Sequence, residues 1–174
     1  MVAFGSVHPC APIEDFIQEL CLYREAEGSS VEITFVGAGG TEVERWINAC
    51  RALNVPTVSL GELSAGEISK VLSNADYGIS TTPALMAEKS GAIAAMLAHG
   101  LPVLCLRQLT ARGFERDFAP SNVSVYKKGC ISEFLDKRPS PSAIGDGLRA
   151  VAASFVKDLT EAHPPSGSGK TGLV

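Results

Sequence analysis

Small and polar residues at the start of one predicted helix are suited to binding a phosphate group. The polar loop Thr81–Pro83 leads toward an Ala-rich stretch that begins with Ser90 and Gly91. Small side chains leave the backbone N–H groups of a first helical turn open, and the helix dipole adds positive potential there. Lys89 would meet a phosphate as a point charge, and Glu88 would accept hydrogen bonds from sugar hydroxyls. An ordinary helix N-cap at Ser90 beside a surface Lys–Glu pair explains the same residues equally well.

A glycine-rich turn, Gly37–Gly40, invites comparison with dinucleotide-binding loops. The fingerprint G-x-G-x-x-G requires Gly or Ala at position 42, where this chain has Glu42, whose carboxylate would repel a pyrophosphate. The fingerprint also follows the first strand of its domain, whereas this turn follows the second predicted strand. We therefore expect a plain strand-to-helix turn and no NAD. The stretch Ser166–Thr171 ends like a P-loop, but Pro164 replaces the Gly that the motif needs, so we assign it to a tail.

Alternating strand and helix patterns would position these turns at one edge of a sheet. Short apolar and β-branched runs predict strands at 2–4, 31–36, 56–60, 76–80, 102–106 and 123–126. Helical spacing predicts helices from 13 to the Gly at 28, and at 43–50, 64–75, 90–99, 131–135 and 148–159. The third begins with a capping box formed by Ser64 and Glu67. These elements predict the α/β class, with a Rossmann-like open parallel sheet of about six strands and helices on both faces. Ligands bind such sheets at the carboxyl ends of the strands, near the point where the strand order reverses.

Composition limits the possible functions. The chain has 174 residues, of which 45% are hydrophobic and 20% charged, as expected for a folded, soluble domain over residues 1–161 with a flexible tail at 162–174. The net charge of −4 and the lack of a basic stripe argue against a nucleic-acid partner. Five Cys without a CxxC motif and three His without ligand spacing predict reduced structural thiols and no metal site. No apolar run approaches the roughly 18 residues of a transmembrane segment and no secretory signal is visible, which predicts a cytoplasmic protein.

One family combines several of these patterns in the same order. The stretch NADYGISTTP…EKSGAIAAMLAHGLPVL is similar to the donor-binding half of the two-Rossmann-domain (GT-B) glycosyltransferases. VAFGSVHP resembles the first strand and loop of that half, and ITFVGAGGTE its second strand. VSLGELSAGEISKVLSNAD resembles the stretch that precedes the fourth strand. The resemblance covers about residues 2 to 107.

The resemblance implies a nucleotide sugar, with UDP or GDP as its nucleotide, as substrate and no separate cofactor. Ser90 and Gly91 would donate N–H groups to the diphosphate, and Glu88 would contact the sugar or ribose. Loops after the first three strands would line the diphosphate or acceptor-facing cleft, the nucleotide and the base, in that order. The residues that the resemblance places at the donor are Gly5, Ser6, Gly37, Gly39, Leu60, Gly61, Leu63, Pro83, Glu88, Lys89, Ser90 and Gly91.

Departures from the family pattern leave the catalytic residues unknown. Many retaining members carry a second glutamate five residues before the Gly of GLPV, where this chain has Ala95. The resemblance covers the donor-binding half alone, and no stretch of the 174 residues resembles the acceptor domain of the family. We therefore expect the chain to need an N-terminal domain or a separate subunit that completes the cleft, and to turn over little alone. Through such a partner the chain could also be held at the surface of the inner membrane. Two alternatives stay open: a non-catalytic regulatory or scaffolding module, and a relative of the nucleotide-sugar 2-epimerases, for which His8 and Glu88 are the candidate groups.

Overall fold

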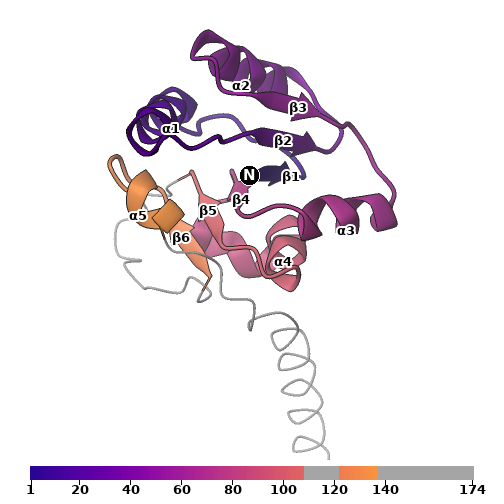
Figure 1. Ribbon diagram of the computed structural model, residues 1–174. Coiled ribbons are helices and arrows are strands. Elements are labelled where there is room, and N and C mark those ends of the chain that lie inside the picture. Colours follow the sequence, from indigo (N-terminus) through magenta and orange to yellow (C-terminus); the bar gives the residue numbers. More distant parts are fainter. Residues whose placement is uncertain (108–121, 137–174) are drawn as a thin grey trace, which may run out of the picture.

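A computed structural model describes residues 1–107 and 122–136. Within these ranges the chain forms one six-stranded, all-parallel sheet with the order β3-β2-β1-β4-β5-β6 (Figure 1). The α/β fold class and the Rossmann-like parallel sheet are therefore confirmed. The predicted helix at 148–159 and the domain end at 161 lie outside the described residues. The strands are β1 (Val2–Phe4), β2 (Ile33–Val36), β3 (Thr57–Ser59), β4 (Gly78–Ser80), β5 (Val103–Cys105) and β6 (Val123–Val125).

The six strands occur where the sequence predicts them, but five are shorter than their apolar runs. Neighbouring strands are paired through three residues each, except at the centre of the sheet. There β1 meets β4 through two pairs, Val2 with Gly78 and Ala3 with Ile79. The strand order also reverses at this pairing, because β1 is followed by β2 on one side while β4 is followed by β5 on the other.

Helices cover both faces of the sheet, as predicted (Figure 1). The helix α1 ends at Gly28, which adopts the left-handed conformation at φ 60° that glycine tolerates best. The capping box of α3 is present, with the Ser64 side chain and the Glu67 side chain each binding the other residue's backbone N–H. In the described ranges no helix has the length and apolarity needed to cross a membrane. The helices are α1 (Ile13–Glu27), α2 (Thr41–Ala52), α3 (Ala65–Ser73), the 3-10 helix η1 (Ala84–Lys89), α4 (Gly91–Ala98) and α5 (Ile131–Asp136).

The two faces enclose separate hydrophobic cores. Helices α1, α2 and α5 bury an aromatic core in which Trp46 is fully buried, with Phe35 edge-on to it at a centroid distance of 6.0 Å. Helices α3 and α4 bury a second, mainly aliphatic core around Ile93 and Met96. Burying a large apolar side chain contributes about 1.5–3 kcal/mol, so each core holds its helices firmly against the sheet. The packed helices therefore hold both ends of the sheet in place, the end where the strands begin and the end where they finish.

Candidate functional site

The carboxyl ends of β1 and β4 lie side by side where the strand order reverses. This is the place at which open α/β sheets bind their ligands, because the connections on either side diverge and leave a crevice. Three segments converge there: the loop that begins at Gly5, the turn that begins at Gly37, and the first turn of α4. We call these three segments the switch-point site.

Two glycines allow the three segments of the switch-point site to approach one another closely. Gly37 has a φ of 145°, and a Cβ placed on it would lie 2.8 Å from the carbonyl oxygen of Gly5. Gly5 itself has a φ of 90°, and its Cβ would lie 3.0 Å from the Cβ of Ala92 in α4. The N–H of Gly5 donates to the carbonyl of Val36, and the N–H of Gly37 donates to the carbonyl of Gly61. Sequence reasoning selected Gly5 and Gly37 for the site, and the structure brings them together.

A buried threonine, absent from the predicted set, holds the loops after β1 and β4 together. Thr81 is 4% exposed, and its Oγ1 accepts a hydrogen bond of 2.9 Å from the backbone N–H of His8. The same hydroxyl donates to the carbonyl of Ser6 at 3.3 Å. Because these contacts join residues more than 70 positions apart, no local sequence pattern could have indicated them. Thr81 therefore positions Ser6, which is one of the predicted donor residues.

The first turn of α4 offers backbone donors to a ligand. Ser90 is its N-cap, with its Oγ accepting the N–H of Ile93 at 3.3 Å. The N–H of Ser90 donates to the carbonyl of Ala87 at 3.1 Å, so this predicted donor already has a partner. The first N–H groups of an α-helix have no intrahelical acceptor, so those of Gly91 and Ala92 are the backbone donors of this turn that a ligand could use.

The helix N-termini of the described residues differ in charge. Acidic residues occupy the first turns of α1, α2, α3 and α5, whereas the first turn of α4 has none. In α2, which follows the glycine-rich turn, Glu42 lies in the first turn and pairs with Arg45 at 3.7 Å. A carboxylate at a helix N-terminus already interacts with the positive end of the helix dipole and would repel an anionic ligand there. An anionic ligand at this edge of the sheet is therefore best placed against α4.

Other predicted donor residues lie farther from the centre of the site. Glu88 and Lys89 are exposed at the end of η1, a helix where the sequence predicts a loop. That stretch is rich in helix-forming residues, which explains the 3-10 turns after the buried Pro83. Gly39 is exposed and lines a hollow of about 10 Å³ together with Gly5 and Gly37.

The predicted donor residues of the loop after β3 lie in different surroundings. The carbonyl of Gly61 accepts the N–H of Gly37, so Gly61 supports the switch-point site. Leu63 is half-buried and packs against the core beneath α3 and α4. Leu60 lines a different and larger cavity, toward the edge where the strands begin. The structure thus brings Gly5, Ser6, Gly37, Gly39, Gly61 and the Ser90–Gly91 turn into one region, and directs Leu60 elsewhere.

The chemistry that this arrangement offers is anion binding through backbone groups. Near the carboxyl end of β5, Cys105 is fully buried, and burial raises the pKa of its thiol to about 12. A thiol with such a pKa stays protonated at neutral pH and is no nucleophile. Within residues 1–107 and 122–136, no three His, Cys, Asp or Glu side chains lie close enough to hold a metal ion. No protein-family model and no curated protein matches this chain.

Proposed function

We propose that the chain is the nucleotide-sugar-binding half of a GT-B-type glycosyltransferase and holds the diphosphate of a UDP- or GDP-sugar at the switch-point site. The complete enzyme would transfer the sugar to an acceptor hydroxyl. The acceptor oxygen bonds to the anomeric carbon as the bond to the diphosphate breaks, and the hydroxyl proton passes to a base. The acceptor site, and that base, would come from an N-terminal domain or a separate subunit.

The observation that carries the proposal is the contact of Gly5 with α4 where the strand order reverses. The missing side chain of Gly5 lets the β1 loop approach the first turn of α4 within van der Waals distance. A diphosphate lying there would accept hydrogen bonds from the N–H groups of Gly91 and Ala92 without opposing carboxylates in that turn. Preorganised donors of this kind stabilise the charge that develops on a leaving diphosphate.

Two basic side chains, in addition to the N–H groups of Gly91 and Ala92, would strengthen the binding of a diphosphate. Lys89 is exposed one residue before Ser90, and Arg107 is half-buried two residues after β5. Lys89 follows β4 and Arg107 follows β5, so both belong to the β4-β5-β6 half of the sheet. An exposed helix terminus contributes about 0.3–1 kcal/mol to binding an anion. We therefore expect the isolated chain to bind a nucleotide weakly, with full affinity requiring the partner that closes the cleft.

Calorimetric titration with UDP, GDP and their hexose conjugates tests the proposal. Replacing Gly91 with Trp would cover the first turn of α4, and a Cβ at Gly91 meets no atom within 4 Å. We expect Gly91→Trp to weaken nucleotide binding by about tenfold or more. The matched control is Ala98→Trp, which places the same side chain at the exposed far end of the same helix.

The titration has two outcomes that would overturn the proposal. One is no binding of any of these nucleotides to the unaltered chain at millimolar concentration. The other is an equal loss of affinity in Gly91→Trp and Ala98→Trp, which would place the nucleotide away from the switch-point site.

A second candidate is a module that binds the donor without transferring it. The position that corresponds to the second glutamate of many retaining members is Ala95, a half-buried residue of α4. Nucleotide binding that persists with no transfer, even after the partner is supplied, would favour this candidate over the transferase.

A further inference from the structure

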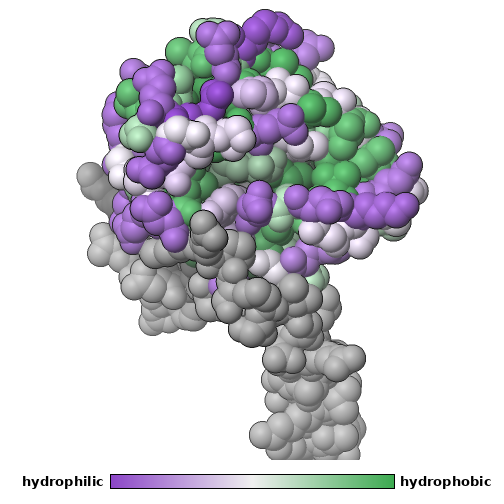
Figure 2. All heavy atoms as spheres, viewed as in Figure 1, coloured by the Kyte–Doolittle hydropathy of each residue, from purple (hydrophilic) through white to green (hydrophobic). Residues whose placement is uncertain are grey.

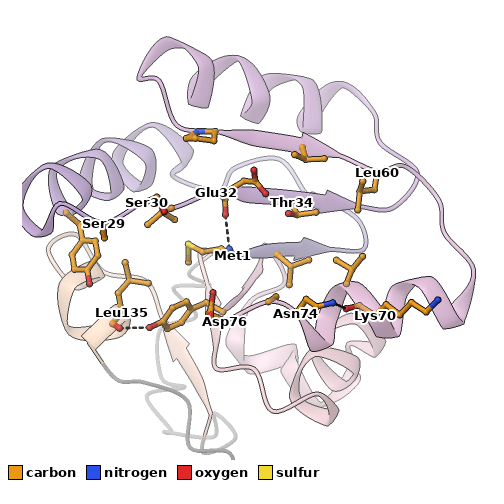
Figure 3. A pocket seen from close by; sticks show the side chains of 18 residues that line it. Met1, Ser29, Ser30, Glu32, Thr34, Leu60, Lys70, Asn74, Asp76 and Leu135 are labelled. Atoms are coloured by element: carbon orange, nitrogen blue, oxygen red, sulfur yellow. Dashed lines mark hydrogen bonds between the residues drawn. The ribbon is translucent and has the colours of Figure 1, made fainter.

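A groove starts at the end of the sheet where the strands begin and extends between β3 and α3 as far as Leu60. Its volume is about 810 Å³, and residues of β1, β2, β3, α3 and α5 line it. Figure 3 shows Leu135 at one end, Met1 and Asp76 in the middle, and Lys70 and Leu60 at the other end. We call it the amino-edge groove.

At the β3 end of the amino-edge groove, apolar side chains are exposed beside Lys70 and are left uncovered by the described residues. Val2, Thr34 and Val58 are register partners across β1, β2 and β3, on the face that packs against α3. Val58 is 39% exposed and Leu60 is 40% exposed. Figure 2 shows hydrophobic residues gathered between β3 and α3. A contiguous apolar surface of this kind marks a place where another element docks.

The sequence contains an element of matching character. Beyond the described residues, the predicted helix 148–159 carries a one-sided stripe at the spacing i, i+3, i+4, i+7, i+8 and i+11, which needs an apolar surface to bury it. We propose that this helix docks in the amino-edge groove of its own chain. The stripe consists of Leu148, Val151, Ala152, Phe155, Val156 and Leu159.

The described part of the chain ends next to the amino-edge groove, so the predicted helix needs only a short connection to reach it. The last described residue, Asp136, follows Leu135, which lines the groove and whose carbonyl accepts a hydrogen bond from Tyr77. Residues 137–147 reach roughly 35 Å when extended, which is more than the connection requires. From β4 to β3 the groove crosses three strand spacings, roughly 14 Å. The stripe from 148 to 159 is roughly 16 Å long as a helix, so the two lengths agree.

Charges of both signs surround the amino-edge groove, because Lys70 and the Met1 ammonium line it beside two carboxylates. Glu32 and Asp76 both line the groove and are exposed. In the predicted helix Arg149 lies beside the stripe, whereas Lys157 lies on the side opposite to it. Exposed ion pairs contribute little affinity, so the apolar stripe would supply the binding energy.

A double-mutant cycle in the full chain tests the docking. Leu60→Ala and Phe155→Ala are made singly and together, and stability is measured by urea unfolding. If the two side chains touch, the effects are not additive, and we expect a coupling of about fivefold or more in the unfolding equilibrium constant. Ser154→Ala is the matched control, because Ser154 lies on the opposite side of the predicted helix and should combine additively with Leu60→Ala.

Hydrogen exchange in the full chain gives a second measurement. We expect Phe155→Asp to accelerate amide exchange in residues 57–60 and 70–75, while Ser154→Asp leaves it unchanged. Additive effects in the cycle together with unchanged exchange would overturn the proposal. Coupling that appears only as protein concentration rises would also overturn it, because the occupant would then be a second copy of the chain.

Discussion

A methyl group on Gly37 would lie 2.8 Å from the carbonyl oxygen of Gly5, so the turns after β2 and β1 meet through bare backbone. This contact lies beside the point at which the strand order reverses. A side chain at Gly37 has no room at this contact.

Replacing Gly37 with Ala tests how strongly this contact is required. The φ of 145° is strained for an L-residue and the new Cβ would press on backbone that cannot rotate away. We expect a loss of about 1–3 kcal/mol in the free energy of unfolding, measured in urea. Gly66→Ala in α3 is the control, since its Cβ meets nothing within 4 Å. That change should stabilise the chain by about 0.5–1 kcal/mol. Equal effects of the two substitutions would contradict the strained contact.

Thr81→Val removes the buried hydroxyl while keeping the shape of the side chain. The N–H of His8 and the carbonyl of Ser6 then lose a partner across the switch-point site. We expect the unfolding free energy to fall by about 1–3 kcal/mol and the His8 amide to exchange faster. Thr82→Val is the neighbouring control, and it should leave the exchange of the His8 amide unchanged. If the His8 amide still exchanged slowly in Thr81→Val, the Thr81 hydroxyl would not be needed to hold the two loops together.

The capping box of α3 predicts a pH-dependent effect of Ser64→Ala. Hydrogen bonds from the Ser64 side chain and backbone lower the pKa of Glu67 from its usual value of 4.5. A carboxylate with a lowered folded-state pKa stabilises the protein above its unfolded pKa, and this contribution disappears as the pH falls through the folded pKa. At pH 7 the loss of the cap should cost about 1 kcal/mol. The difference between the two proteins should shrink below pH 4.5 in urea titrations at several pH values. A difference that grows on acidification would contradict the assigned hydrogen bonds.

Alkylation should distinguish the buried cysteines from the exposed one. Burial raises the pKa of Cys50 to about 11 and that of Cys105 to about 12. Both thiols are shielded from solvent, whereas Cys10 is exposed in the loop after β1. At pH 8 we expect iodoacetamide to modify Cys10 first and to reach the buried pair only after urea is added, as followed by mass spectrometry. Labelling of Cys105 at the rate of Cys10 in the native protein would be inconsistent with the buried β5.

Most of the fold could be predicted because it depends on local patterns. Apolar runs identified all six described strands, and the capping box of α3 and the Gly28 end of α1 followed from the chemistry of those residues. The strand ends were less accurate, because apolar residues such as Val31 continue past the last ladder pair into the core.

The candidate site was only partly predictable, because its geometry depends on contacts between distant segments. Gly5 and Gly37 could be selected from their positions after strands, but their mutual contact could not. Thr81 acts through partners more than 70 positions away. The 3-10 helix η1 was missed because its six residues are too few for a helical stripe to appear. The direction of Leu60 depends on which face of β3 is covered, and no local pattern specifies that.

The narrow pairing of β1 with β4 has a mechanical consequence. Only two residue pairs join the β3-β2-β1 half of the sheet to the β4-β5-β6 half, fewer than at any other described strand boundary. The switch-point site lies directly over this seam, with Gly5 and Gly37 on one half and α4 on the other. A ligand held by both halves, as proposed above, would therefore link them where the fewest residue pairs connect neighbouring strands.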